Sequence, residues 1–212
     1  MKLKTLSLVS AGLFVLAGLA GLSFTQAPAQ TAAQNNSAPE TYKLDVASST
    51  AEWKAYKVTG QHNGTVTLKS GSLTVNDGNL TGGSFEMDMT TIKVLDTQGE
   101  WGTKLEGHLK SDDFFSSEKF PTATFAITKV ASRGTAGSYR VTGNLTIKGI
   151  TKEIKFDATL KTEGGKATGE ATLKIDRTDF DIRFRSGNFF ENLGDKTIYD
   201  EFDLVVKLVA NK

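Results

Sequence analysis

The chain has 212 residues, with 25 lysines and arginines against 24 aspartates and glutamates, and it contains no cysteine. This balance leaves no basic surface of the kind that binds nucleic acid, so we expect no nucleic-acid partner. The absence of cysteine excludes disulfides, thiol catalysis and a lipid-modified N-terminal cysteine, and a folded domain must therefore rely on its core.

Residues 1–29 have the pattern of an export signal. A short positive start at residues 1–4 precedes an unbroken run of apolar residues and glycines at 11–22, and residues 27–29 have the A-x-A form of a signal-peptidase site. We therefore expect cleavage after Ala29, a periplasmic or otherwise exported protein, and no stable membrane insertion after that cleavage.

An uncleaved N-terminal anchor is the alternative, because residues 5–24 are about as long as a bilayer span. Residues 30–40 are polar and low in bulky side chains, which predicts a flexible linker. The folded domain is then expected to cover residues 41–212.

Alternation of apolar and polar residues dominates the remainder of the chain. Side chains with period two share one face of a strand, and such one-sided strands are typical of antiparallel sheets. Short turns rich in glycine and Asn-Asp separate the strands, which predicts successive hairpins. The alternation is clearest at 85–90, 139–148, 153–161, 166–175 and 202–208.

The pattern predicts one all-β domain of about eight or nine strands. A closed up-and-down barrel and a two-sheet sandwich both fit it, since periodicity does not separate them. Closure has the advantage that it removes exposed strand edges.

Residues 98–112 are the one segment with helical spacing. Trp101, Leu105, His108 and Leu109 fall on one helix face. The spacing predicts a short helix between two hairpins, with Trp101, Leu105 and Leu109 against an apolar surface. His108 is the one polar residue of that face that would look inward.

Catalytic and metal-binding patterns are weak. The two histidines, His62 and His108, lie far apart in the sequence and form no zinc-binding motif. There is no G-x-S-x-G nucleophile motif. We therefore expect no enzyme activity, no catalytic residue, no metal and no cofactor, with a hydrolase using His108 as the weaker alternative.

Arg177 lies in a stretch, 175–183, that interleaves three acids and two arginines with apolar residues. One interpretation is a strand that leaves the sheet into a turn held by Asp–Arg pairs. The other is an arginine at a barrel mouth that meets a polar or anionic head group.

Several motifs together resemble the YceI-like family, over residues 41–210. They are Tyr42–Asp45, Ala51–Trp53, Leu105–Phe115, Phe120–Phe125, Val141–Gly149 and Ile175–Phe180. The resemblance implies a lipocalin-like, eight-stranded antiparallel β-barrel with a short covering helix near residues 98–112. Family members are exported proteins that enclose a long-chain isoprenoid or another lipid, and no catalytic reaction is established for the family as a whole.

The resemblance also implies two sets of ligand-binding residues. The set expected to line an apolar tunnel is Phe85, Met87, Phe125, Ile127, Val141, Leu145, Ile154, Phe156, Leu173, Ile175 and Phe202. The set expected at the mouth and cover is Trp101, Leu105, His108, Leu109, Phe114, Phe115 and Arg177. A filled-core structural or interaction module stays the main alternative, because a phenylalanine-rich interior fits a packed core equally well. A homodimer is left open.

Overall fold

The computed structural model describes residues 38–212, so the predicted signal segment and most of the predicted linker lie outside the described residues. The first strand begins one residue before the predicted domain start. The elements are β1 (Glu40–Leu44), β2 (Thr50–Lys57), β3 (Gly60–Asn76), β4 (Asn79–Val94), α1 (Gly99–Lys110), β5 (Thr122–Ser132), β6 (Ser138–Ile147), β7 (Ile150–Glu163), β8 (Lys166–Asp176) and β9 (Ile198–Asn211), with short 3-10 turns η1 (Val46–Ser48), η2 (Arg177–Phe180) and η3 (Gly194–Lys196).

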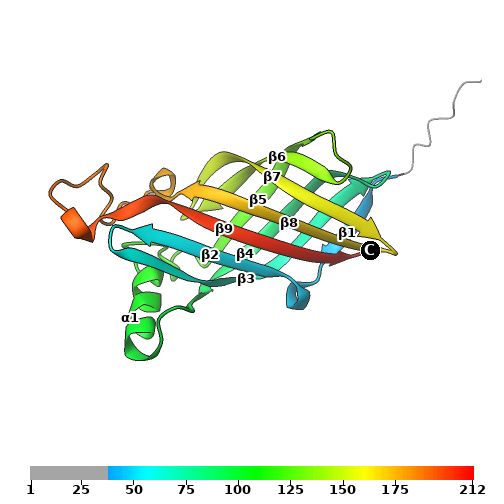
Figure 1. The fold of residues 1–212 in the computed structure, drawn as a ribbon. Helices are drawn as coiled ribbons and strands as arrows, with labels where there is room; N and C mark the ends of the chain where they lie inside the picture. Colours follow the sequence, from blue (N-terminus) through cyan, green and yellow to red (C-terminus); the bar gives the residue numbers. More distant parts are fainter. Residues whose placement is uncertain (1–37) are drawn as a thin grey trace, which may run out of the picture. The chain divides into compact units, whose positions relative to one another are not determined.

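The strands close into an antiparallel barrel (Figure 1). Each strand from β2 to β9 pairs with the next one along the chain, and β9 pairs back to β2. β1 pairs with the same two neighbours as β2, namely β3 and β9, so the two segments share one position in the wall. The wall therefore has eight positions, which confirms the predicted eight-stranded barrel over the sandwich.

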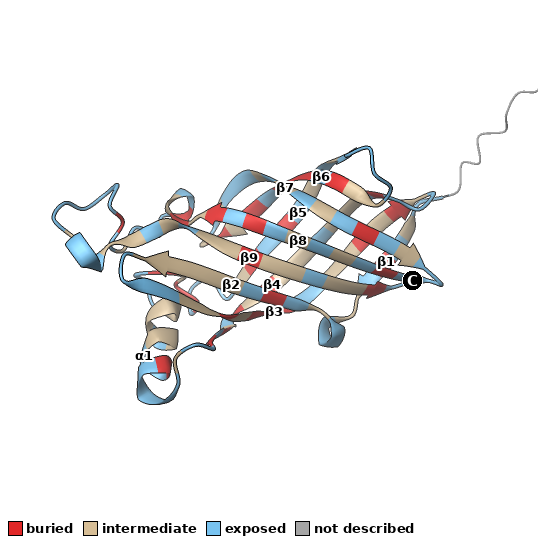
Figure 2. Cartoon of the chain, viewed as in Figure 1, coloured by how far each residue is buried: buried red, intermediate tan, exposed pale blue. Residues whose placement is uncertain are grey.

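Period-two alternation explains why the wall encloses a core. In β6, the side chains of Tyr139, Val141 and Leu145 are buried, whereas those of Arg140 and Asn144 are exposed. Figure 2 shows a similar alternation of exposed residues with buried or intermediate ones along β8. Burial of the inward set removes apolar surface from water, which is the main stabilising term in a chain without disulfides.

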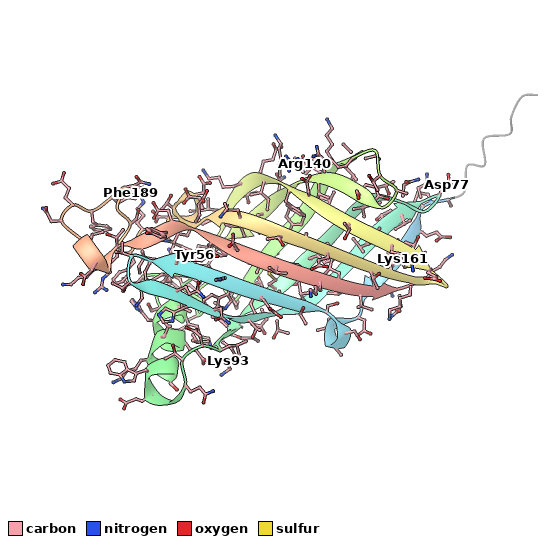
Figure 3. The ribbon with its side chains drawn as sticks, viewed as in Figure 1. Tyr56, Asp77, Lys93, Arg140, Lys161 and Phe189 are labelled. Atoms are coloured by element: carbon pink, nitrogen blue, oxygen red, sulfur yellow. The ribbon has the colours of Figure 1, made fainter. Side chains whose placement is uncertain are left out.

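The barrel has two distinct ends. The hairpin end carries the turns β3–β4, β5–β6 and β7–β8, together with the end of β9. The mouth end carries α1, η2, η3 and the loop between η2 and β9. This loop extends beyond the barrel and contains the exposed Phe189 (Figure 3).

Helix α1 forms within the predicted segment and is fastened to the end of β4. The Glu106 carboxylate accepts hydrogen bonds from Val94 N–H at 3.1 Å and from Lys93 Nζ at 3.1 Å. The bond from Val94 holds the pKa of Glu106 below its ordinary value, and Lys93 adds to this effect. The helix is thus held at the mouth end by a long-range hydrogen bond to the sheet.

The predicted apolar face of the helix is wrong at its first position. Trp101 is 74% exposed, not packed on an apolar surface. The helix buries Gly102 and turns Glu106 toward the barrel, each one residue on from the predicted Trp101 and Leu105, whereas Leu109 packs on the core as predicted. Gly102 has no side chain, so the backbone there lies directly against the carbonyl of Thr97. The tie at Glu106 and this close approach fix the rotation that leaves Trp101 outside.

Candidate functional site

The barrel interior contains two apolar cavities, each of about 90 Å³. We call them the hairpin-end cavity and the mouth-end cavity. Met87, Leu145 and Leu204 line both, so these three side chains form a waist between them. The interior is therefore neither one open tunnel nor a fully packed core.

The predicted tunnel residues mostly lie where the alternation put them. Ile154 is the exception, since it packs at the margin of the core and lines neither cavity. The hairpin-end cavity takes Phe85, Met87, Phe125, Ile127, Val141, Leu145, Phe156 and Leu173 from the predicted set, and the mouth-end cavity takes Met87, Leu145, Ile175 and Phe202. Their role in ligand binding remains a prediction.

Sequence reasoning missed the contribution of β3. Leu68 and Leu73 line the hairpin-end cavity, although Ser70-Gly71 between them interrupts the alternation. The pairing of β3 with β4 shifts register at three places, and each shift changes which residues face inward. The signals in the sequence were two short alternations, Val66-Thr67-Leu68 and Leu73-Thr74-Val75.

The end of the covering helix closes the mouth-end cavity. Leu109, Phe114 and Phe115 line it, as predicted for the cover, whereas Leu105 is half-buried and lines neither cavity. Phe115 meets Phe202 of β9 edge to face, with ring centroids 6.4 Å apart. The aromatic side chains after the helix, more than the helix itself, seal this end.

His108 does not face the cavity, contrary to expectation. Its Nε2 lies 2.9 Å from Asp113 Oδ2, and this pair is exposed to solvent. The imidazole ring also stands edge-on against Phe114 and Phe184, with centroids 4.9 and 4.7 Å away. His108 therefore packs on the outer side of the aromatic seal. Among the hydrogen bonds of residues 38–212, none joins a serine hydroxyl to this ring.

Arg177 is buried at the mouth end and borders the cavity there. Its Nε donates to Tyr199 O at 3.1 Å and its Nη1 to Ile182 O at 2.7 Å. Its Nη2 donates to Ile198 O and to Asp200 Oδ1, both at 3.0 Å. Four of its five N–H groups are therefore used inside the protein, which favours the turn-holding interpretation of the sequence.

Asp200 extends this network into the loop between η2 and β9. Its second carboxylate oxygen accepts hydrogen bonds from Ser186 Oγ at 2.9 Å and from Asn188 Nδ2 at 2.8 Å. Burial lowers the pKa of the Arg177 guanidinium, and the charges of Asp200 and Asp176 oppose this shift. A buried charge needs hydrogen-bond partners of this kind. The network therefore holds η2, the loop after it and the start of β9 together at the mouth end.

His62, whose role the sequence left open, forms a second tie at the mouth end. Its Nδ1 lies 2.8 Å from Asp96 Oδ2, and Asn63 N–H donates to Asp96 Oδ1 at 3.0 Å. Burial works against ionisation of Asp96, but the bonds from Asn63 and His62 together lower its pKa. This tie joins the start of β3 to the segment that leads into α1.

Two further findings concern residues 38–212 only. No group of three or more His, Cys, Asp or Glu side chains there is arranged to hold a metal ion. No helix in that part of the chain is long and apolar enough to cross a membrane.

Comparison with known proteins shows which family the sequence matches. The model of the YceI-like domain matches residues 42–210. A UPF0312 protein of Photorhabdus laumondii is 37% identical over 126 residues, which cover 56% of this chain and 58% of that protein. A UPF0312 protein of Pseudomonas putida W619 is 37% identical over 116 residues, which cover 50% of this chain and 60% of that protein. The matches thus span less than two thirds of these curated relatives.

Solved structures share the fold. BcnA of Burkholderia cenocepacia superimposes with a TM-score of 0.62 at 20% identity, covering 79% of this chain and 99% of that one. A polyisoprenoid binding domain from Saccharophagus degradans, implicated in plant cell wall breakdown, superimposes with a TM-score of 0.59 at 12% identity, covering 80% and 97%. At such low identity these similarities establish the barrel architecture alone.

Proposed function

This chain belongs to the YceI-like family, and on that premise we propose that it binds a long-chain isoprenoid or a related amphiphile inside its barrel, without catalysing a reaction. The observation that carries the proposal is the pair of apolar cavities in series, which meet at a waist of three apolar side chains. The polyisoprenoid binding domain with the same fold supports the choice of ligand class.

Burial of apolar surface supplies the driving force. Each square ångström of tail removed from water contributes about 25 cal/mol, so a tail of several isoprene units has ample affinity for a dry interior even after ordering costs. An apolar interior selects weakly among tails. We therefore expect tolerance of tail chemistry.

The tail needs more room than the resting cavities provide. Ligand pockets commonly measure about 300–1,000 Å³, whereas each cavity here measures about 90 Å³. Met87 at the waist and Met89 beside it are unbranched and adapt readily to a new shape. We infer that these side chains move aside to join the two cavities when a tail enters.

Export fits this function. A polyisoprenoid tail is insoluble, and an aqueous compartment outside the cytoplasm requires a carrier for it. The signal pattern at residues 1–29 supports a periplasmic or otherwise exported protein.

The test is to express the full-length precursor with export, purify it without detergent and analyse an organic extract by mass spectrometry. We expect a long-chain isoprenoid or related lipid in stoichiometric amount. An empty extract, from protein that also fails to take up added geranylgeraniol, would overturn the proposal in favour of a filled-core module.

A matched pair of variants locates the binding. Val206→Trp adds bulk inside the hairpin-end cavity, which Val206 lines, and should abolish uptake. Val205→Trp makes the same change on the neighbouring residue of β9, which faces the other side of the wall, and should not. Equal uptake by both variants would place the lipid outside the barrel.

A further inference from the structure

The wall of the barrel is forked between β7 and β8. Their ladder runs from the pair Glu163–Lys166 at the hairpin end only as far as the pair Ala158–Ala171. Beyond it, residues 150–157 pair with β6, and residues 172–176 pair with β9, but the two segments do not pair with each other. Figure 1 shows β7 and β8 meeting at their hairpin, beside the C-terminus.

The hairpin-end cavity lies directly behind the wall at this fork. Ala158, Thr159, Glu170 and Ala171 line the cavity on its inner side. The same four residues line a groove on the outside of the barrel. Next to them, Phe156 and Leu173 line the cavity, whereas Asp157 and Thr172 line the groove. Only the unpaired parts of β7 and β8 therefore separate the cavity from the groove at the end of the ladder.

Small side chains leave the apex of the fork open. Ala158 and Ala171 face the interior as a pair, yet both are only half-buried. The fork between β4 and β5 is different: its ladder ends at Ser84–Ala126, but the side chain of Ile127 lies against Gly83 and fills the space. An unpaired seam is thus plugged at one place and left open at the other.

Contacts also bridge the two sides of the fork at the mouth end, so the unpaired region is closed at both ends. Lys148 Nζ donates to Asp181 O at 3.0 Å, and Lys152 Nζ lies 3.5 Å from Asp179 Oδ1. These contacts bridge the β6–β7 turn and the start of β7 to η2 and the residue after it. The unpaired strand segments therefore have contacts between β7 and β8 or η2 at both ends.

We propose that the β7–β8 fork is a lateral portal through which the apolar tail crosses the barrel wall into the hairpin-end cavity, a proposal that rests on lipid binding as the proposed function. The outer groove supplies polar groups that solvate a head group during passage, among them Arg133, Ser138, Asp157 and Thr172. Passage between these unpaired segments breaks no hydrogen bond between strands. Passage between two paired strands would break several.

The test bridges the fork covalently. The chain has no cysteine, so Asp157→Cys with Thr172→Cys places two unique thiols on the outer face, one on each side of the fork. Lys161→Cys with Thr168→Cys is the matched control, because this pair lies on a hydrogen-bonded rung of the same hairpin. Lys161 is labelled near the hairpin end in Figure 3. Each double variant is reacted with a short bis-maleimide.

The readout is the rate of uptake of geranylgeraniol that carries a fluorescent anthraniloyl ester. We expect bridging of the fork to slow uptake by about tenfold or more, a barrier increase of about 1.4 kcal/mol, with no change for the bridged control. Equal rates in both bridged proteins, with uptake intact, would overturn the portal and leave lipid binding standing. No uptake by the unbridged proteins or the unmodified chain would overturn lipid binding and the portal with it.

Discussion

The two cavities of the barrel are built by different means. Strand residues alone line the hairpin-end cavity, and their inward orientation follows from period-two alternation. The mouth-end cavity is closed by aromatic side chains after α1 and by a buried arginine that donates four hydrogen bonds. Local patterning therefore accounts for the first cavity apart from the contribution of β3, whereas the second depends on specific long-range bonds.

The largest effect is expected from breaking the mouth network. Arg177→Met removes the donor to three backbone carbonyls and leaves the partly buried Asp200 carboxylate without its cation. Loss of one partner of a buried ion pair costs about 3–5 kcal/mol. Denaturant unfolding of the wild type and the variant measures this loss in the free energy of unfolding. The control Arg183→Met breaks an exposed pair with Asp181 and should cost less than about 1 kcal/mol; similar small losses for both would mean that Arg177 does not anchor the mouth.

The waist can be opened by one substitution. Leu145→Ala removes a fully buried side chain shared by the two cavities and should lower the free energy of unfolding by about 2–5 kcal/mol. It should not weaken geranylgeraniol binding, because the joined cavity offers the tail more room. Leu80→Ala, which enlarges the hairpin-end cavity without touching the waist, serves as the control. Binding weakened at Leu145 alone would contradict a movable waist.

The pH dependence of stability tests the tie between α1 and the sheet. The pKa of Glu106 is lowered on folding, chiefly by the bond from Val94 N–H, from an ordinary value of 4.5. Its contribution is therefore fully present above the unfolded-state pKa and is lost as the pH falls through the folded-state pKa. The difference in unfolding free energy between the wild type and Glu106→Gln should shrink as the solution is acidified below about pH 4.5. Parallel pH profiles would show that the tie contributes no pH-dependent stability.

The smallest effect is expected at the exposed helix face. Trp101→Ser should change the free energy of unfolding by no more than about 0.5 kcal/mol, because the indole is largely in solvent. Leu109→Ser, on the face that meets the barrel, should cost more than about 1 kcal/mol by placing a hydroxyl at the apolar cavity. Thermal unfolding compares the two, and a larger loss at Trp101 would restore the helix rotation predicted from the sequence.

The cavity-lining residues also differ in whether the sequence pattern could predict them. Phe156, Leu173 and Phe202 were found because the two-residue period of their strands is unbroken. Leu68 and Leu73 were missed because register shifts between β3 and β4 interrupt that period. Pattern reading therefore succeeds where the strand is regular and fails at bulges.

The contacts at the mouth end could not be predicted from the sequence pattern. The partners of Arg177 are mostly backbone carbonyls of β9 and of the loop before it, and backbone atoms carry no residue signature. The rotation of α1 depends on Glu106 meeting the Val94 N–H, which helical spacing does not encode. The length of each ladder, and with it the fork at Ala158, is a property of the closed barrel rather than of either strand.

Methionine NMR tests most directly whether a lipid tail occupies the interior. The chain has three methionines, and two of them, Met87 and Met89, line the cavities, with Met87 at the waist. With ¹³C-labelled methyl groups, addition of geranylgeraniol should shift both interior signals in a saturable, one-to-one manner. Unchanged interior signals in a sample that binds the lipid would show that the tail lies elsewhere and would contradict the proposed function.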